Sequence, residues 1–188
     1  MALLIADASP IVGFVAASQH SLLWDVISTI HGHIYVPAHV NGEITRIAKK
    51  ISRKALNNYD WMKNTQQVQV LPVVAVTSPV ASWAATMLDS IPADFHDRTK
   101  DLGEALTVAH ARNFRQQGTS ADVLIDDSGG TKFAQTYQVQ CHTTVWIFDE
   151  AITQQRITTS THLKDAYQAV ARHSKLPALE GTGLLSRV

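Results

Sequence analysis

Acidic side chains recur along the chain at points where a folded domain can bring them together. The five candidates are Asp7, Glu43, Glu104, Asp126 and Asp127. Asp7 and Asp126 directly follow short apolar runs, which indicate buried parallel strands because strands covered on both faces are almost continuously hydrophobic. Ligands bind at the carboxyl ends of such strands in open α/β sheets. Carboxylates gathered there are typical ligands of a hard divalent cation, Mg²⁺ or Mn²⁺, used in phosphate chemistry.

A cation would also solve the problem that such a cluster creates for itself. Carboxylates a few ångströms apart repel one another, and some take up protons if nothing compensates their charge. We expect Asp7, Glu104 and Asp126 to be the inner metal ligands, with Asp127 as a further ligand. Mg²⁺ binds only one or two carboxylates directly and keeps several waters, so the remaining acids act through water. Glu43 completes the expected catalytic set.

Two hydroxyl side chains lie near the ends of predicted strands, where they could orient the acids. Ser9 follows Asp7 by two residues, and Thr143 follows the last predicted strand. Either hydroxyl is expected to hydrogen-bond an acidic ligand or a ligand water, which would fix the geometry around the ion. A covalent mechanism is disfavoured, because neither Ser9 nor Cys141 belongs to a recognisable motif that activates a nucleophile.

Composition limits the remaining possibilities. A chain of 188 residues suits one domain with a sizeable core, or one domain plus an appendage. Lys and Arg together number 16, as do Asp and Glu, so binding to a polyanion requires a local basic patch. Cys141 is the only cysteine, which excludes an intramolecular disulfide. The nine histidines show none of the Cys/His spacings of a zinc site.

The apolar run at the N-terminus does not have the pattern of a secretory signal. No basic residues precede it, Asp7 interrupts it, and Pro10 follows soon after. No other stretch approaches the roughly 20 apolar residues of a membrane span. We therefore expect a soluble, cytoplasmic protein.

Hydrophobic periodicity predicts strands that alternate with helices. The predicted strands cover residues 2–6, 34–36, 68–71, 122–125 and 139–142. The predicted helices cover residues 11–17, 22–30, 37–56, 102–114, 145–153 and 163–173, with shorter candidates at 82–88 and 133–137. Residues 90–100, the Ser128-Gly129-Gly130 segment and the tail after Pro177 are predicted to be loops. This alternation predicts a three-layer α/β/α sandwich with a central parallel sheet.

Four segments carry the acids in a fixed order along the chain. They are LIADAS at residues 4–9, VPAHVNGE at 36–43, DLGEA at 101–105 and VLIDD at 123–127. Together these segments resemble the PIN-domain family, the fold of VapC-type toxin ribonucleases. Thr143 matches a helix-capping hydroxyl often found beside the site in that family. The resemblance spans roughly residues 2–154 and implies a PIN-like nuclease domain at 1–154, followed by a C-terminal helical extension and tail at 155–188.

The chain departs from the family pattern in three places. Ser128–Thr131 stands where family members often carry basic residues. His142 stands where a glycine usually precedes the capping threonine. The region from Thr65 to Lys100 is longer than the compact toxins need. These differences bear on the choice of substrate more than on metal binding.

The resemblance implies a metal-dependent endoribonuclease that hydrolyses RNA phosphodiester bonds with Mg²⁺ or Mn²⁺ as cofactor. It further implies the toxin of a type II toxin–antitoxin pair, with an antitoxin protein and a second copy of the chain as partners. The alternative is a catalytically inactive PIN-like module that binds RNA or a protein. The Ser128–Thr131 loop and the net charge of +0 favour that alternative.

A run of basic residues just beyond Glu43 could guide RNA toward the acids. Its members are Arg46, Lys49, Lys50, Arg53 and Lys54. At about 3.6 residues per turn they share one broad helical face. RNA phosphates bound there would be released as salt rises, and Trp61 or Tyr59 would stack an unpaired base. The same run is equally typical of a solvated helix face, so both interpretations stand.

Overall fold

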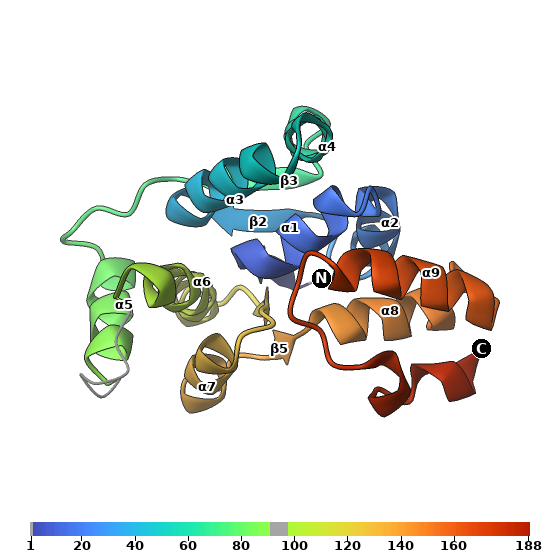
Figure 1. Ribbon diagram of the computed structural model, residues 1–188. Coiled ribbons are helices and arrows are strands. Elements are labelled where there is room, and N and C mark those ends of the chain that lie inside the picture. The colour runs from blue at the N-terminus through green and yellow to red at the C-terminus, as the bar shows by residue number, and fades with distance from the viewer. Residues whose placement is uncertain (1, 91–97) are drawn as a thin grey trace.

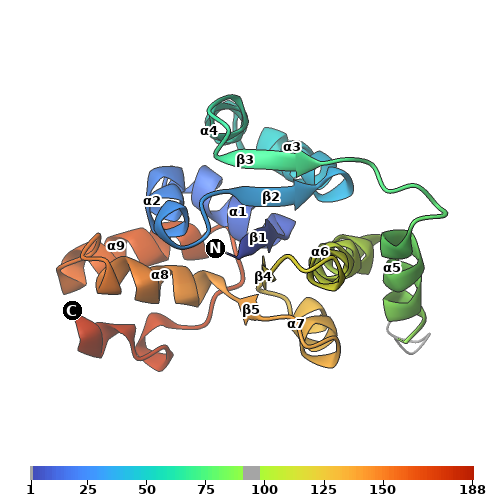
Figure 2. The same cartoon turned by 180° about the vertical axis from the view of Figure 1, so that it is seen from behind.

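The structure is a computed structural model that describes residues 2–90 and 98–188 (Figure 1). Within these residues, five parallel strands form one sheet in the order β3-β2-β1-β4-β5. The strands are β1 (Leu3–Ala6), β2 (Ile34–Pro37), β3 (Val68–Leu71), β4 (Ala121–Leu124) and β5 (Cys141–His142). Figure 2 shows the arrowheads of β2 and β3 pointing in the same direction. The strand order reverses between β1 and β4, and open α/β sheets bind ligands beyond the carboxyl ends of the strands at such a point.

Helices cover both faces of this sheet. One face carries α1 (Ala8–Ala16), α2 (His20–Ile30), α3 (Ala38–Ile51), α4 (Arg53–Asn64), α8 (Thr144–Thr153) and α9 (Ser160–Ala171). The other face carries α5 (Pro79–Asp89), α6 (Arg98–Gln116) and α7 (Ser128–Thr136). The predicted three-layer sandwich with a central parallel sheet is therefore confirmed. No helix in the described part of the chain is both long enough and apolar enough to cross a membrane.

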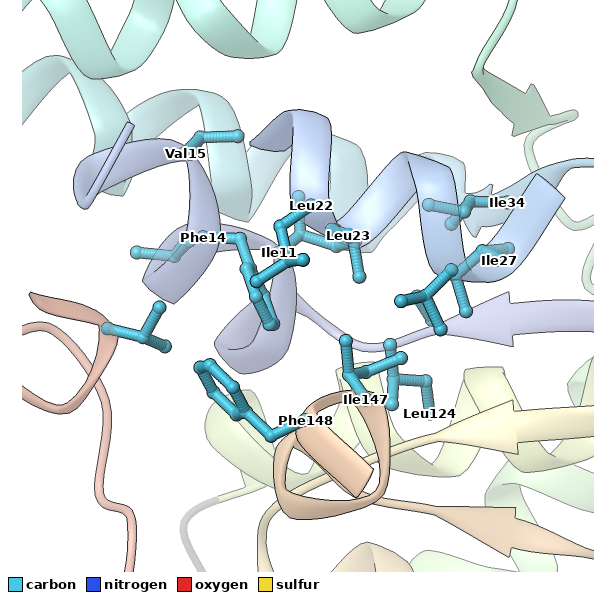
Figure 3. Packing of buried hydrophobic residues seen from close by; sticks show 14 of the residues in the cluster. Ile11, Phe14, Val15, Leu22, Leu23, Ile27, Ile34, Leu124, Ile147 and Phe148 are labelled. Carbon is cyan, nitrogen blue, oxygen red and sulfur yellow. The ribbon is translucent and has the colours of Figure 1, made fainter. Parts of the chain in front are cut away.

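Successive side chains of β1, the central strand, point to opposite faces of the sheet, so the core has two halves. Leu4 packs into the cluster beneath α1, α2 and α8, whereas Ile5 packs into the cluster beneath α6. In the first cluster, the rings of Phe14 and Phe148 stack with their centroids 5.7 Å apart, which joins α1 to α8 (Figure 3). Each fully buried side chain of this size contributes about 1.5–3 kcal/mol. Packing in the two clusters fixes the positions of β1 and β4, the strands that Asp7 and Asp126 follow.

The prediction of a single helix over residues 37–56 is wrong, because α3 ends and α4 begins at Ser52. Ser52 has an extended backbone, with φ −168° and ψ 158°, and its side-chain oxygen accepts a hydrogen bond from the Ala55 N–H at 3.0 Å. A serine in this conformation is a strong N-cap, so α4 begins immediately after it. Arg53 and Lys54 therefore lie on α4 rather than beside Lys49 and Lys50 on α3, and the predicted shared basic face is also wrong.

The predicted loops differ from the structure as well. Of the loop predicted at 90–100, residues 91–97 lie outside the described residues. Residues 98–100 belong to α6, which therefore begins before the DLGEA segment at 101–105. The Ser128-Gly129-Gly130 segment forms the first turn of α7. The tail after Pro177 is not loose, because Leu179 and Leu184 are buried in the core.

Segments beyond residue 154 pack into the same core as the rest of the chain. A Cβ added at Gly13 of α1 would lie 3.1 Å from Val170 Cγ1 of α9, so these two helices are in close contact. The Tyr167 hydroxyl donates a hydrogen bond to the Pro177 carbonyl at 2.8 Å, and Arg187 pairs with Asp149 of α8. The division into domains at residue 154 stays a prediction, although α9 and the tail share the hydrophobic core of the sandwich.

Candidate metal centre

All five predicted acids line one cavity at the carboxyl ends of the central strands. Asp7 follows β1, Glu43 lies on α3 and Glu104 on α6, while Asp126 and Asp127 follow β4. The cavity has a volume of about 450 Å³. It lies beside the point where the strand order reverses, as expected for a ligand site in this architecture. The sequence segments that carry the acids are therefore brought together by the sheet.

Gly103 allows two of these carboxylates to converge. A Cβ added at Gly103 would lie 3.3 Å from Asp7 Oδ1 and 3.4 Å from Glu43 Oε2. The two oxygens therefore face the same small region beside the backbone of α6. Any side chain at position 103 would push into the space between them, which explains the glycine one residue before Glu104.

Gly129 and Gly130 also allow close packing beside carboxylates, at the α7 side of the cavity. A Cβ at Gly129 would lie 3.0 Å from Glu104 Oε2 and 3.4 Å from Asp127 Oδ1. A Cβ at Gly130 would lie only 2.7 Å from Ile125 Cγ2, closer than real side chains come. The first turn of α7 therefore packs directly against β4 and Glu104. This close packing accounts for small residues where the family pattern often has basic ones.

Asp7 is buried, with only 7% of its surface exposed, and it forms the N-cap of α1. Its Oδ2 accepts a hydrogen bond from the Ser9 backbone N–H at 3.5 Å. Burial raises the pKa of Asp7 to about 6; the backbone N–H groups of Ala8 and Ser9 oppose this shift, while the charges of Glu43 and Asp126 add to it. Ser9 lines the cavity, and the hydrogen bond to Asp7 comes from its backbone N–H.

Asp126 is held by Thr144. The Thr144 backbone N–H donates to Oδ1 at 2.7 Å, and its hydroxyl donates to Oδ2 at 2.7 Å. Burial raises the pKa of Asp126, and both Thr144 bonds work against that rise. Thr143 occupies the N-cap position of α8, but its hydroxyl makes no capping hydrogen bond to any described residue. The hydroxyl that bonds Asp126 in the structure is therefore that of Thr144, while a bond from Thr143 to a ligand water stays a prediction.

Asp127 combines two roles. It lines the cavity, and it is the N-cap of α7, where its Oδ1 accepts a hydrogen bond from the Gly129 N–H at 2.9 Å. The Thr131 hydroxyl donates to the Asp127 carbonyl at 2.9 Å, which fixes the same turn. Asp127 thus has a structural reason to be acidic whether or not it contacts a metal.

Three residues of the cavity wall were missed from the sequence. His173, Ser174 and Lys175 line the cavity from the segment that follows α9. They lie outside the segments that carry the acids and belong to no motif. Only the packing of α9 against α1 brings them there: a Cβ at Gly13 would lie 3.2 Å from Ser174 Oγ. Lys175 adds a cation to a predominantly acidic site.

The predicted basic residues do not form one surface. Arg46, Lys49, Lys50 and Arg53 are all exposed. Arg46 and Lys50 follow Glu43 by three and seven residues, so they lie on the side of α3 that faces the cavity, next to Ile47. Lys49 points away from that side, and Arg53 begins α4.

The donor set fits a hard divalent cation. The candidate ligands are carboxylate oxygens, which suit Mg²⁺ and Mn²⁺, whereas softer ions favour imidazole and thiolate. Glu104, like Asp7, is almost fully buried, at 3% exposed. Burial disfavours the charged form of Asp7, and a bound cation would compensate that charge. Asp7, Glu104 and Asp126, the predicted inner ligands, all line the cavity and could hold such an ion.

Replacing Thr144 with valine is expected to weaken divalent-cation binding about 10–100-fold, as loss of a group that orients a metal ligand typically does. Valine keeps the shape but removes the hydroxyl bond to Asp126 Oδ2. Titration calorimetry with Mn²⁺ measures the effect. Thr143→Val is the matched control and is expected to bind Mn²⁺ like the wild type. Equal losses in both variants would contradict the role assigned to Thr144.

Comparison with known proteins places the whole sandwich in one family. A family model described as a PIN domain matches residues 3–175. No curated protein matches the chain. The match continues past residue 154 through α9 and ends at Lys175, so it includes every residue that lines the acidic cavity.

Proposed function

Because the chain belongs to the PIN-domain family, a nuclease fold, we propose that it is a metal-dependent ribonuclease that hydrolyses RNA phosphodiester bonds. The observation that carries the proposal is the convergence of Asp7, Glu104 and Asp126 on one cavity at the strand ends. Carboxylates collected in this way are suited to phosphate chemistry with Mg²⁺ or Mn²⁺.

The acids of the cavity have two parts in the proposed reaction, holding the cation and accepting a proton. Asp7, Glu104 and Asp126 would hold the cation, which when bound polarises a phosphate and acidifies a water. Glu43 lies in the cavity wall near Asp7 and accepts the proton that the attacking water loses. The water oxygen bonds to phosphorus, the bond from phosphorus to the 3′-oxygen breaks, and that oxygen takes up a proton from solvent water. Thr144 keeps Asp126 oriented throughout.

Positive charges at the rim supply the substrate contacts in this proposal. Lys175 in the cavity wall is placed to bind the phosphate at the cleavage point, and Arg46 and Lys50 the neighbouring phosphates. Lys49 and Arg53 serve phosphates farther along the strand. Affinity should therefore fall as salt rises. Trp61, 45% exposed, remains available to stack a base, whereas Tyr59 is fully buried and is excluded.

A role as the toxin of a toxin–antitoxin pair is the finer form of the proposal. It requires a surface for an antitoxin or a second copy. Val73 and Val76, 84% and 92% exposed, border an apolar cavity of about 490 Å³ between the end of β3, α5 and α6. Exposed apolar surface of this kind is typical of sites that bind proteins.

The test is cleavage of a mixed RNA pool by the purified protein with Mg²⁺ or Mn²⁺, with and without a chelator. The wild type is expected to cut only with metal, and Asp7→Asn and Glu104→Gln are expected to be inactive. Equal cutting by all three proteins would assign the activity to a contaminant. Tight, acid-dependent Mn²⁺ binding without cleavage of any RNA would favour the alternative, an inactive binding module.

Replacing Gly103 with alanine is expected to reduce cleavage at least about 10-fold without destabilising the fold, because alanine favours a helix by about 1 kcal/mol over glycine. The added methyl would enter the space between Asp7 Oδ1 and Glu43 Oε2. Gly42→Ala is the matched control: it lies on α3, beside Glu43, with no described atom within 4 Å of the new methyl. Cleavage rates and urea denaturation measure both effects. Full activity in Gly103→Ala would contradict the convergence of these two carboxylates.

A further inference from the structure

A second group of potential metal ligands consists of residues that do not line the acidic cavity. It consists of His31, Asp122 and His142, and one ligand atom from each lies within 4.8 Å of the others. His31 directly follows α2, Asp122 lies in β4, and His142 ends β5. Because three separate elements supply them, no spacing in the sequence reveals the group.

His31 of this cluster contacts the chain just before β1, at the other end of that strand from Asp7, whereas His142 ends β5, two residues before Thr144. His31 Nδ1 lies 3.0 Å from the carbonyl oxygen of Ala2, which precedes β1, whereas Asp7 follows that strand. The four residues of β1, at about 3.3 Å each, separate its two ends by roughly 13 Å. In both views the N-terminus lies near α2 and α8 (Figures 1 and 2). None of the three residues lines the acidic cavity, so an ion bound here would have its own set of ligands.

His31 is arranged as a metal-binding histidine would be. The Ala2 carbonyl can only accept a hydrogen bond, so Nδ1 carries the proton in the neutral ring and Nε2 keeps its lone pair. His31 is 6% exposed, and its Nε2 has no hydrogen-bond partner among the described residues. Histidines that bind metals typically donate their other ring N–H to a carbonyl or carboxylate, which fixes the tautomer.

Asp122 and His142 supply the other two potential ligand atoms. Asp122 lies two residues before Leu124 on β4, so both side chains are on the same face of the sheet. His142 of β5 pairs with Leu124. His142 Nε2 lies 3.6 Å from Asp122 Oδ2, and the side chains are 14% and 18% exposed. Donor atoms around one tetrahedral zinc lie roughly 3.3–3.5 Å apart, given metal–ligand bonds of about 2.0–2.1 Å.

The surroundings hold the ligands in place. The ring of Trp146 on α8 lies against His142, with centroids 3.9 Å apart, and the His31 ring meets His142 edge-on at 5.8 Å. Aromatic walls limit the movement of both imidazoles and exclude most water. The remaining exposure of Asp122 and His142 leaves room for a small fourth ligand.

We propose that His31, Asp122 and His142 bind one borderline transition-metal ion, Zn²⁺ or Co²⁺, with water as the fourth ligand. Two imidazoles and one carboxylate suit such ions, whereas the all-carboxylate cavity suits Mg²⁺ and Mn²⁺. The ion joins the end of α2, β4 and β5. It also fixes the chain just before Thr144, which orients Asp126. The site does not depend on the proposed nuclease activity.

The test is a Co²⁺ titration of the metal-free full-length protein in excess Mg²⁺, which saturates the acidic cavity. The wild type is expected to develop the visible absorption of tetrahedral Co²⁺, to saturate at one equivalent, and to lose the signal when Zn²⁺ is added. His31→Gln and His142→Gln are expected to weaken Co²⁺ binding at least about 100-fold, because each removes a ligand rather than an orienting group. Circular dichroism checks that each variant folds.

Two control variants distinguish Co²⁺ bound at this cluster from Co²⁺ bound elsewhere on the protein. His162→Gln removes an exposed histidine of α9, and Asp7→Asn alters the acidic cavity; both should titrate like the wild type. Wild-type protein without saturable absorption, or equal affinity in all variants, would overturn the proposal and leave only an ion pair between Asp122 and His142. The wild-type titration decides the question even if a histidine variant fails to fold.

Discussion

Replacing Asp7 with asparagine is expected to abolish RNA cleavage while making the metal-free protein more stable. Asparagine keeps the size of the side chain and still caps α1, but it cannot hold a cation. Loss of groups that merely orient metal ligands costs about 10–100-fold, so loss of a ligand should cost at least about 100-fold. Single-turnover cleavage with Mn²⁺ measures this change.

The gain in stability follows from the burial of Asp7. Burial raises its pKa from 3.8 to about 6, which means that the folded state disfavours the charged form. At about 1.4 kcal/mol per pKa unit, the charge costs on the order of 3 kcal/mol at neutral pH. Asp165→Asn, which neutralises an exposed acid on α9, is the control and should alter neither activity nor stability. A variant that loses both activity and stability would show that Asp7 serves the fold rather than the reaction.

The stability difference between Asp7→Asn and wild type is expected to depend on pH in the absence of metal. With a raised pKa in the folded state, Asp7 is protonated in both states below about pH 4, and the two proteins should then be equally stable. As the pH rises from about 4 to 6, the unfolded chain releases this proton first, so the wild type loses stability relative to the variant. The difference should reach its full size above about pH 6.

The comparison with the variant is necessary because another buried group acts in the same pH range with the opposite sign. Burial lowers the pKa of His110 to about 4, so the protein loses stability as the pH falls below the ordinary value of 6.5. Subtracting the free energy of unfolding of one protein from that of the other cancels the contribution of His110. Urea denaturation from about pH 4 to 7 in a chelator gives the difference. A difference that does not vary with pH would contradict the raised pKa of Asp7.

Addition of Mn²⁺ at pH 7 should reverse the order of stability. A ligand at about 1,000 times its dissociation constant stabilises the folded state by about 4.1 kcal/mol, which exceeds the cost of the Asp7 charge. The wild type should gain this stabilisation, and Asp7→Asn should gain little of it. Equal gains in both proteins would place the Mn²⁺ outside the acidic cavity.

The positions of the acids were predictable because they depend on local pattern. Short apolar runs fix where β1 and β4 end, and a residue that follows a parallel strand must lie at the carboxyl edge of the sheet. Asp7 and Asp126 follow directly from this rule. Glu43 and Glu104 lie on helices, and only their order in the chain connected them with the strand-end acids.

Other features depend on contacts that no local pattern contains. Thr143 is the N-cap of α8 and Thr144 its first residue, and only the contact with Asp126 shows that Thr144 supplies the hydroxyl. Ser52 breaks a continuous helical pattern by capping the next helix. Lys175 enters the cavity only through the packing of α9. The cluster of His31 with Asp122 and His142 likewise exists only in three dimensions.

The most direct measurement is a crystal structure of the protein soaked in Mn²⁺, with the ion located by anomalous diffraction. The carboxylates of Asp7, Glu104 and Asp126 line one cavity, and a manganese peak bound by their oxygens is expected there. Crystals in which these three carboxylates bind no ion at saturating Mn²⁺, or in which their oxygens are too far apart to share one, would contradict the account.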